Sequence, residues 1–465
     1  MNMINVRRLT VMTFLGASML SGISAQVSPL QVDTLKETKI PDQWDLQSCI
    51  DYAKEQNITI RKNRITAAST QIDVKTAKAA LFPSLSFSTS QQVVNRPYQE
   101  TSSRVSGSEI ISSNSKTSYN GNYGLNASWT LYNGNKRLKT IQQEKLNNQV
   151  AELDVATSEN NIQESIAQVY IQILYAAESV KVNESTLQVS IAQRDRGQEL
   201  LNAGSIAKSD FAQLEAQVST DRYQLVTAQA TLEDYKLQLK QLLELDGENE
   251  MNIYLPALSD ENVLAPLPTK KDVYIRALSL RPEIEASKLN VEASELGIGI
   301  AKSSYLPTIS LSAGIGTNHT SGSDFTFGEQ VKNGWNNSIG LSVSVPIFNN
   351  RQTKSAVQKA KLQYETSMLS LLDEQKTLYK TIEGLWLDAN SAQQRYAAAN
   401  EKLKSTQISY ELISEQFNLG MKNTVELLTE KNNLLQAQQE QLQAKYMAIL
   451  NTQLLKFYQG DQLAI

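Results

Sequence analysis

Two stretches of this sequence repeat each other: residues 77–90 read AKAALFPSLSFSTS, and residues 301–314 read AKSSYLPTISLSAG. Five positions are identical when the stretches are aligned, among them Pro83 with Pro307. In both stretches a helix-forming segment ends before the proline, and serines alternating with apolar residues follow it. The sequence therefore predicts the same helix-to-strand junction twice in one chain.

The repetition continues on both sides of these junctions. The first copy is predicted to contain a helix over 45–80, strands over 83–92 and 122–132 around a polar loop at 95–118, a long helix over 134–201 and a helix to about 245. The second is predicted to contain a helix over 281–304, strands over 308–316 and 338–348 around a polar loop at 318–336, a long helix over 349–419 and a helix to about 458. From the second strand onward, equivalent residues of the two copies are separated by the same number of positions, as Leu125 is from Leu341 and Gly204 from Gly420. We therefore expect a duplication of about 220 residues.

The chain begins with the features of a secretory leader. Arg7 and Arg8 precede an apolar run, and small residues up to Ala25 offer a cleavage site. A proline-rich segment separates the two copies. The predicted units are a signal peptide (1–25), a first repeat (26–246), a linker (247–270) and a second repeat (271–465).

The composition argues against several classes of protein. The formal net charge of −4 offers no basic surface for nucleic acid. Cys49 is the only cysteine, so an internal disulfide is impossible, and we expect a buried helical thiol. His319 is the only histidine and lies in a predicted polar loop, so one chain cannot assemble a His-based triad or a multi-histidine metal site. No glycine-rich phosphate loop precedes a helix. We expect neither an enzyme nor a bound cofactor or metal.

The predicted strands have one apolar face and one face of small polar residues. A soluble sandwich would show the same alternation, but the sequence offers no further strands for a second sheet. Segments of about ten residues with this pattern are typical of transmembrane β-barrels. Aromatic residues that could form an interfacial girdle lie near the strand ends: Phe82, Trp129, Tyr132, Tyr305 and Phe348. Four strands cannot close a barrel, and open edges are excluded from lipid, so closure requires other copies of the chain.

The predicted helices are unusually long. Residues 134–201, at 1.5 Å per residue, form a rod roughly 100 Å long. In the last helix Leu428, Leu435, Leu442 and Ile449 recur every seven residues, which predicts a coiled-coil seam. An ordinary long coiled coil would account for the helices alone. The strand pairs inserted between them favour a membrane-anchored hollow tube.

Across the mature sequence the chain resembles the TolC-type outer membrane efflux proteins. The resemblance rests on three motifs that each occur twice: the junctions at 81–84 and 305–308, the strand ends at 132–134 and 348–350, and the turns at 202–205 and 418–421. It implies a mainly α fold with membrane β-structure, in which a homotrimer forms a 12-stranded β-barrel continued by a 12-helix periplasmic α-barrel. The linker would lie in an equatorial region.

The resemblance also implies a function and partners. It implies an outer-membrane channel-tunnel that serves as exit duct of a tripartite efflux or type I secretion system. The partners would be a periplasmic adaptor, an inner-membrane pump and outer-membrane lipid. The adaptor would dock at the helical turns, around Gly204, Ser205, Gly420 and Met421. The alternative is a structural or adhesive trimeric coiled coil on the cell surface.

A gate near the same turns is implied as well. Asp210 and Glu426 each lie six residues beyond a turn glycine, at positions where the family carries aspartates. Lys422 falls where the family can carry an arginine, and Phe417 where it can carry a link-forming tyrosine. Two residues depart from the pattern, because Phe417 has no hydroxyl and Thr429 stands where a second acid is expected. The resemblance implies that Asp210, Phe417, Lys422 and Glu426 form the periplasmic constriction.

Overall fold

The structure is a computed structural model that describes residues 40–463 except 99–101, 107–108, 114–115, 247–250, 257–262, 322 and 324. The predicted signal peptide and part of the predicted linker therefore lie outside the described residues. Residues Asp42–Ile465 form one compact unit, and the elements below belong to it.

The helices repeat between the two halves of the chain. The first half contains α2 (Leu46–Gln56), α3 (Ile58–Ala79), α4 (Lys136–Asn202) and α5 (Lys208–Leu242). The second contains α6 (Lys270–Leu280), α7 (Pro282–Ser303), α9 (Gln352–Asn418) and α10 (Thr424–Tyr458). The long helices α4 and α9 have 67 residues each, and α5 and α10 have 35 each. Each helix that precedes the strands begins and ends as many residues before its counterpart in the second half as Pro83 lies before Pro307. For the helices that follow the strands, the separation equals that between Leu125 and Leu341.

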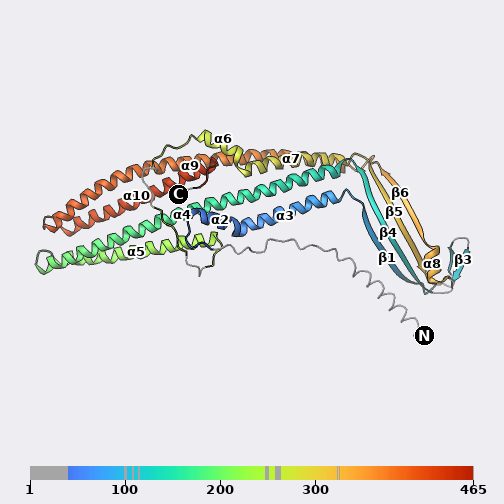
Figure 1. The fold of residues 1–465 in the computed structure, drawn as a ribbon, viewed down its shortest axis with the longest axis horizontal. Helices are drawn as coiled ribbons and strands as arrows, with labels where there is room; N and C mark the ends of the chain where they lie inside the picture. Colours follow the sequence, from blue (N-terminus) through green and yellow to red (C-terminus); the bar gives the residue numbers. More distant parts are fainter. Residues whose placement is uncertain are drawn as a thin grey trace, which may run out of the picture. The chain divides into compact units, whose positions relative to one another are not determined.

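Four strands form one antiparallel sheet in the order β1-β4-β5-β6 (Figure 1). They are β1 (Ser84–Asn95), β4 (Thr117–Asn133), β5 (Thr308–Thr320) and β6 (Asn336–Ser344). The pairing repeats with the chain: Ser84 faces Ser128 in the first hairpin, and the equivalent Thr308 faces Ser344 in the second. The predicted fold class, mainly helical with two strand pairs, is confirmed.

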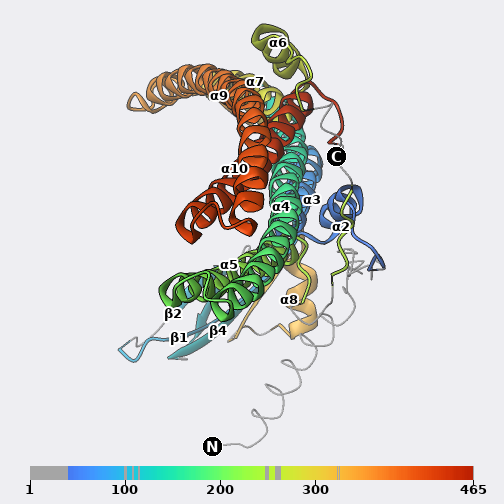
Figure 2. The same ribbon diagram turned by 90° about the vertical axis from the view of Figure 1, so that its left-hand side faces the viewer.

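The helices pack as two long hairpins, α4 with α5 and α9 with α10, and α10 also packs against α4 and α5 (Figure 2). The largest core cluster lies where α2, α4, α5 and α10 meet, and includes Trp44, Tyr170 and Leu454. Cys49 belongs to this cluster and is fully buried, as predicted. A second cluster joins α6, α7, α9 and α10 around Ile284 and Ile382. Burying each such aliphatic side chain contributes about 1.5–3 kcal/mol, which fixes the hairpins against the shorter helices.

Two helix predictions need correction. The helix predicted over 45–80 is two helices, because Asn57 ends α2 and caps α3 by accepting from the amides of Thr59 and Ile60. The side-chain nitrogen of Asn57 also donates to the Leu242 carbonyl, so a contact from α5 holds the break. The helix α6 was not predicted; Thr269 caps it by accepting from the Asp272 amide.

The predicted loops also contain regular structure. The first, 95–118, includes the two-stranded sheet of β2 (Ser102–Ser106) and β3 (Glu109–Ser113). The second, 318–336, includes α8 (Phe327–Asn333), which begins at a capping box formed by Thr326 and Glu329. The strand predicted over 338–348 ends at Ser344. Pro346, which follows, has no N–H to donate to a sheet.

His319 lies in strand β5 and not in a loop as predicted. Its ring stacks on Tyr123 and meets Phe327 of α8 edge-on. Gly121 faces it on β4, and a Cβ at Gly121 would clash with the imidazole ring. The glycine therefore leaves room for the ring of this histidine.

Candidate functional site

Both long helices end at a glycine in the left-handed conformation. Gly204 has φ +72° and Gly420 has φ +74°, and each follows a 67-residue helix. The next amide bonds back across the turn in the same way: Ser205 donates to the Leu200 carbonyl and Met421 to the Gln416 carbonyl, both at 2.8 Å. This is the Schellman arrangement, which satisfies carbonyls at the helix end and reverses the chain.

The two turns are open to their surroundings. Gly204, Ser205 and Gly420 are exposed, and the Met421 side chain is 70% exposed. A Cβ added at either glycine would meet nothing within 4 Å. These turns, which we call the tips (residues 202–205 and 418–421), therefore present accessible surface at the ends of the hairpins.

Lys422 and Glu426 form an ion pair beside the second tip. The Lys422 ammonium lies 2.6 Å from a Glu426 carboxylate oxygen, one helical turn away on α10. The other carboxylate oxygen accepts from the Asn423 amide at 3.2 Å, and Asn423 accepts in turn from the Glu426 amide. The bond from Lys422 and the bond from the Asn423 backbone hold the pKa of Glu426 below its usual value. Glu426 is therefore ionised and oriented at neutral pH.

The other predicted gate residues lie apart from this pair. Asp210 accepts from the Ala207 amide at 3.2 Å and so caps the first turn of α5. Phe417 is 3% exposed, with its ring packed in the hairpin. Thr429 donates to the Val425 carbonyl of its own helix, and Glu430 accepts from Ser409 on α9. Within one chain, the structure joins Lys422 with Glu426 and leaves Asp210 in the other hairpin.

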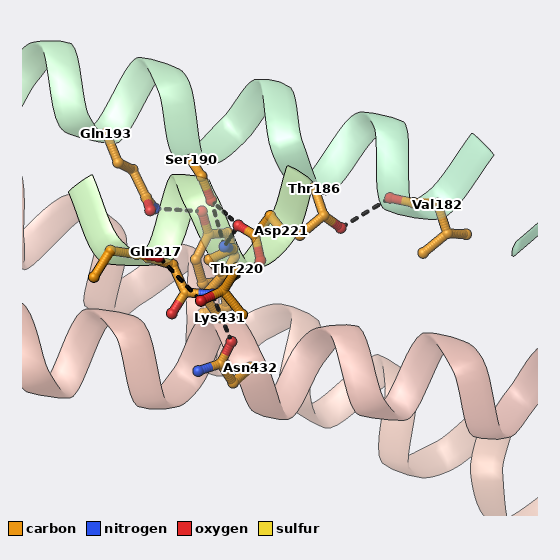
Figure 3. A network of polar contacts seen from close by, with 11 residues as sticks. Val182, Thr186, Ser190, Gln193, Gln217, Thr220, Asp221, Lys431 and Asn432 are labelled. Carbon is orange, nitrogen blue, oxygen red and sulfur yellow. Dashed lines mark hydrogen bonds and ion pairs between the residues drawn. The ribbon is translucent and has the colours of Figure 1, made fainter. Parts of the chain in front are cut away.

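A buried ionic cluster links the two hairpins further along the helices (Figure 3). Lys431 of α10 forms an ion pair with Asp221 of α5, and both contact Ser190 of α4. The Lys431 and Asp221 side chains are 3% and 1% exposed. Gln217 adds a bond to the other oxygen of Asp221 at 2.9 Å. Burial lowers the pKa of Lys431, and the bond and charge of Asp221 oppose that effect. The cluster ties α10 to both helices of the first hairpin.

Neutral hydrogen bonds support the same seam. Gln193 of α4 donates to the Tyr410 hydroxyl of α9 at 2.9 Å. Ser179 of α4 donates to Gln439 of α10 at 3.0 Å. Within a chain, therefore, the seam between the hairpins is held by directional polar bonds in addition to apolar packing.

This cluster was not predicted from the sequence, although one signal was present. Leu427, Lys431 and Leu434 are spaced four and three residues apart and share the buried stripe of α10. A lysine at such a coiled-coil position is buried only when it finds a partner. The partners, Asp221 and Ser190, are 210 and 241 residues away, beyond the reach of any local pattern.

One face of the four-stranded sheet is apolar and exposed. Its exposed side chains are Leu85, Phe87, Val93, Leu125, Leu131, Ile315, Ile339, Leu341 and Val343. The other face consists mostly of serine, asparagine, glycine and threonine, as where Ser84 bonds to Ser128 at 2.8 Å. Contiguous exposed apolar surface of this kind marks a membrane or protein interface.

The predicted aromatic residues gather at one end of the strands. Phe82 and Tyr305 precede β1 and β5, Trp129 and Tyr132 lie near the end of β4, and Phe348 follows β6. Because neighbouring strands are antiparallel, the start of β1 and β5 lies beside the end of β4 and β6, and these positions share the end of the sheet next to the helices. Trp129 donates there to the Leu81 carbonyl at 2.7 Å.

Two absences within the described residues bear on other kinds of site. Among these residues, no group of three or more histidine, cysteine, aspartate or glutamate side chains is arranged to hold a metal ion. No helix within the described part of the chain is both long and apolar enough to cross a membrane.

Comparison with known proteins relates the chain to bacterial efflux components. The outer membrane efflux protein BepC of Brucella suis biovar 1 (strain 1330) is 24% identical over 294 residues, 63% of this chain and 61% of that protein. The outer membrane protein TolC of Escherichia coli (strain K12) is 23% identical over 311 residues, 65% of this chain and 62% of that protein. The chain thus aligns with about three fifths of the length of these two relatives.

The fold comparison covers more of the chain. A crystal structure of CusC matches 90% of this chain and 92% of its own, with a TM-score of 0.76 and 19% identity. At this identity the match shows the fold. The family model described as outer membrane efflux protein matches residues 49–244 and 273–460, both halves of the duplication. The chain therefore belongs to the outer membrane efflux protein family.

Proposed function

We propose that three copies of the chain form a channel-tunnel in the outer membrane, which serves as the exit duct of a tripartite efflux or type I secretion system. One observation carries this proposal: an exposed apolar sheet face stands at one end of helices that are each about 100 Å long. The apolar face suits lipid, and the helices are long enough to extend far from the membrane.

The sheet supports assembly from several copies. Each chain supplies four strands, and the two outer strands, β1 and β6, have no partner at their outer edges among the described strands. Backbone groups at such edges must be paired in lipid. Three copies would supply a 12-stranded barrel, continued by the long helices α4 and α9 of each chain together with the shorter helices packed beside them. The tube would conduct solutes and catalyse nothing.

The tips are the proposed docking surface for a periplasmic adaptor, which would connect the duct to an inner-membrane pump. Gly204, Ser205, Gly420 and Met421 are exposed and lie at the ends of the longest helices. The Schellman bonds order the backbone of each tip, and a pre-ordered surface binds with little loss of entropy.

The gate is proposed beside the tips. In a trimer, threefold symmetry would place three copies of Glu426 and three of Asp210 around the axis, and close carboxylates attract cations. The Lys422 ion pair keeps Glu426 oriented, and Phe417 anchors the end of α9 in the hairpin. Closure would then depend on Asp210, Phe417, Lys422 and Glu426 together.

The direct test combines size with conductance. Protein purified in detergent should be a trimer by light scattering and should show single-channel currents in planar bilayers. A monomer that stays in solution without detergent would refute the proposed channel. A trimer that never conducts would support the surface adhesin instead.

A further inference from the structure

We infer that strand β6 of one copy pairs with strand β1 of the next copy in a register set by the duplication, with Ser342 opposite Ser90 and Val343 opposite Thr89. This inference rests on the proposed trimer and specifies its seam. The occupant of each free sheet edge is a second copy of this chain.

The exposure of equivalent residues shows that the outer strands lack a neighbour. Leu125 of β4 and Leu341 of β6 occupy the same position in the two repeats. Leu125, with a strand on each side, is 40% exposed, whereas Leu341, at the edge, is 64% exposed. A strand added beside β6 would cover part of the Leu341 side chain, as the strands on both sides of β4 cover Leu125.

The two hairpins show that the duplication preserves register residue by residue. In the first hairpin Phe87 faces Leu125, and in the second the equivalent Leu311 faces Leu341. One step along, the pair Ser88–Gly124 has its equivalent in the pair Ser312–Gly340. A position in one repeat therefore predicts the pairing of its counterpart.

The pairing of β4 with β5 then supplies the register of the seam. This pairing joins the first repeat to the second and matches Asn126 with Gly314 and Ala127 with Ala313. In a ring of six equivalent repeats closed by three copies, β6 would join the second repeat to the next copy's first repeat in the same way. The equivalent of Asn126 in the other repeat is Ser342, and the equivalent of Gly314 is Ser90.

The faces of the strands agree with this register. Ser342 and Ser90 both lie on the small-polar face, and Val343 lies on the apolar face with Thr89. A slip of one residue would place serines of β6 on the apolar face. A slip of two residues would preserve the faces, so the experiment must distinguish the inferred register from slips of two.

Cysteine pairs provide that experiment. Ser342→Cys with Ser90→Cys tests one face of the seam, and Val343→Cys with Thr89→Cys tests the other, because directly opposed pairs alternate in geometry along antiparallel strands. The matched controls are Ser342→Cys with Ser88→Cys and Ser342→Cys with Gln92→Cys, which represent slips of two. Direct neighbours have Cβ atoms about 4.5–5.5 Å apart and diagonal ones about 7–8 Å, which is too far for an unstrained disulfide.

The chain is suited to this test. Within one copy β1 and β6 are separated by two strands, about 14 Å, so a disulfide can form only between copies. The native Cys49 does not compete, because burial, helped by the charge of Asp45, raises the pKa of its thiol to about 12.

The full-length protein carrying each pair is oxidised in detergent and examined on a non-reducing gel, after light scattering has established its native size. We expect covalent dimers and trimers in several-fold excess for at least one inferred pair over both controls. Trimers in which a control pair cross-links better, or in which neither inferred pair cross-links, would overturn the register and leave the trimer standing. A monomeric protein would overturn both.

Discussion

The two helical hairpins of this protein have the same geometry and different chemistry. Hairpin α4–α5 and hairpin α9–α10 have equal lengths, bounds at equivalent positions of the two repeats, and the same Schellman turn at Gly204 and Gly420. Their polar positions have diverged. Lys431 of α10 corresponds to Glu215 of α5, and Asp221 corresponds to Ala437.

The difference assigns distinct roles to equivalent positions. Lys431 and Asp221 are buried where the hairpins of one chain meet, whereas Glu215 is exposed and Ala437 is buried without a polar side chain. At the tips, Asn423 and Glu426 cap each other, whereas Ala207, the equivalent of Asn423, has no side-chain acceptor. The two hairpins therefore share one backbone geometry and differ in the polar side chains at their seams.

The largest expected effect is on the buried pair. Lys431→Met should cost about 3–5 kcal/mol of stability, because it leaves the Asp221 carboxylate buried without its counter-charge. Adding Asp221→Leu should restore most of that loss. The matched control, Glu215→Met, changes an exposed position and should stay within about 0.5 kcal/mol. Thermal unfolding followed by circular dichroism measures all three; equal effects of Lys431→Met and Glu215→Met would show that the hairpins are not distinguished by this cluster.

The second comparison concerns the breaks between short helices. Arg281 precedes α7 as Asn57 precedes α3, at equivalent positions of the two repeats. Arg281 is buried and binds Glu164 at 3.2 Å and Glu283 at 2.7 Å. Arg281→Met should cost about 2–3 kcal/mol, since it leaves charged partners unpaired. Asn57→Ala, which removes only a cap, should cost about 1 kcal/mol in the same thermal unfolding experiment.

The pH dependence sharpens this prediction. Burial raises the pKa of Glu164, against the opposing charge and hydrogen bond of Arg281. A carboxyl group whose pKa is higher in the folded state destabilises the fold when ionised, so stability rises as the pH falls through that value. The deficit of Arg281→Met should therefore shrink when melting is measured at successively lower pH. A deficit that grows on acidification would contradict this account.

The glycines of the tips test whether the geometry is equal in the two hairpins. Gly204→Ala and Gly420→Ala should each cost about 1 kcal/mol, because a Cβ disfavours the left-handed conformation. The space around both is open, so only backbone strain contributes. Unequal losses in the same unfolding experiment would show that the turns differ in ways their backbones do not reveal.

Substitutions on the tip surface should leave stability unchanged and affect association. Ser205→Trp and Met421→Trp place a bulky ring on exposed positions, so trimers should form normally. Binding of the proposed periplasmic adaptor, measured by surface plasmon resonance, should weaken for both. Unchanged binding for both variants would exclude docking at the tips.

The smallest expected effect is that of substitutions at the proposed gate. Glu426→Gln removes one charge per chain from a partly exposed position, and it should lower cation selectivity in single-channel recordings. Lys422→Ala combined with Asp210→Ala should loosen closure and raise conductance. If both variants match the wild type in selectivity and conductance, the constriction involves other residues.

Local sequence patterns determined much of this molecule. The helix lengths, the glycine turns and the two-faced strands follow from periodicity and from residues a few positions apart, and nearest-neighbour chemistry decides these features. The Thr326–Glu329 capping box was equally local, and its helix could have been predicted. The resemblance to a known family then supplied the fold class.

Tertiary packing decided what lies between the elements. The rotation of α10 against α4 and α5 determines that Lys431 meets Asp221 and Ser190, and no spacing in the sequence encodes that rotation. The break at Asn57 depends in part on the Leu242 carbonyl of another helix. The register of β4 against β5, which brings Ala127 to Ala313, likewise exists only once the two halves have docked. Periodicity fixes which face of an element is buried, whereas the partner of that face is fixed by the packing of whole hairpins.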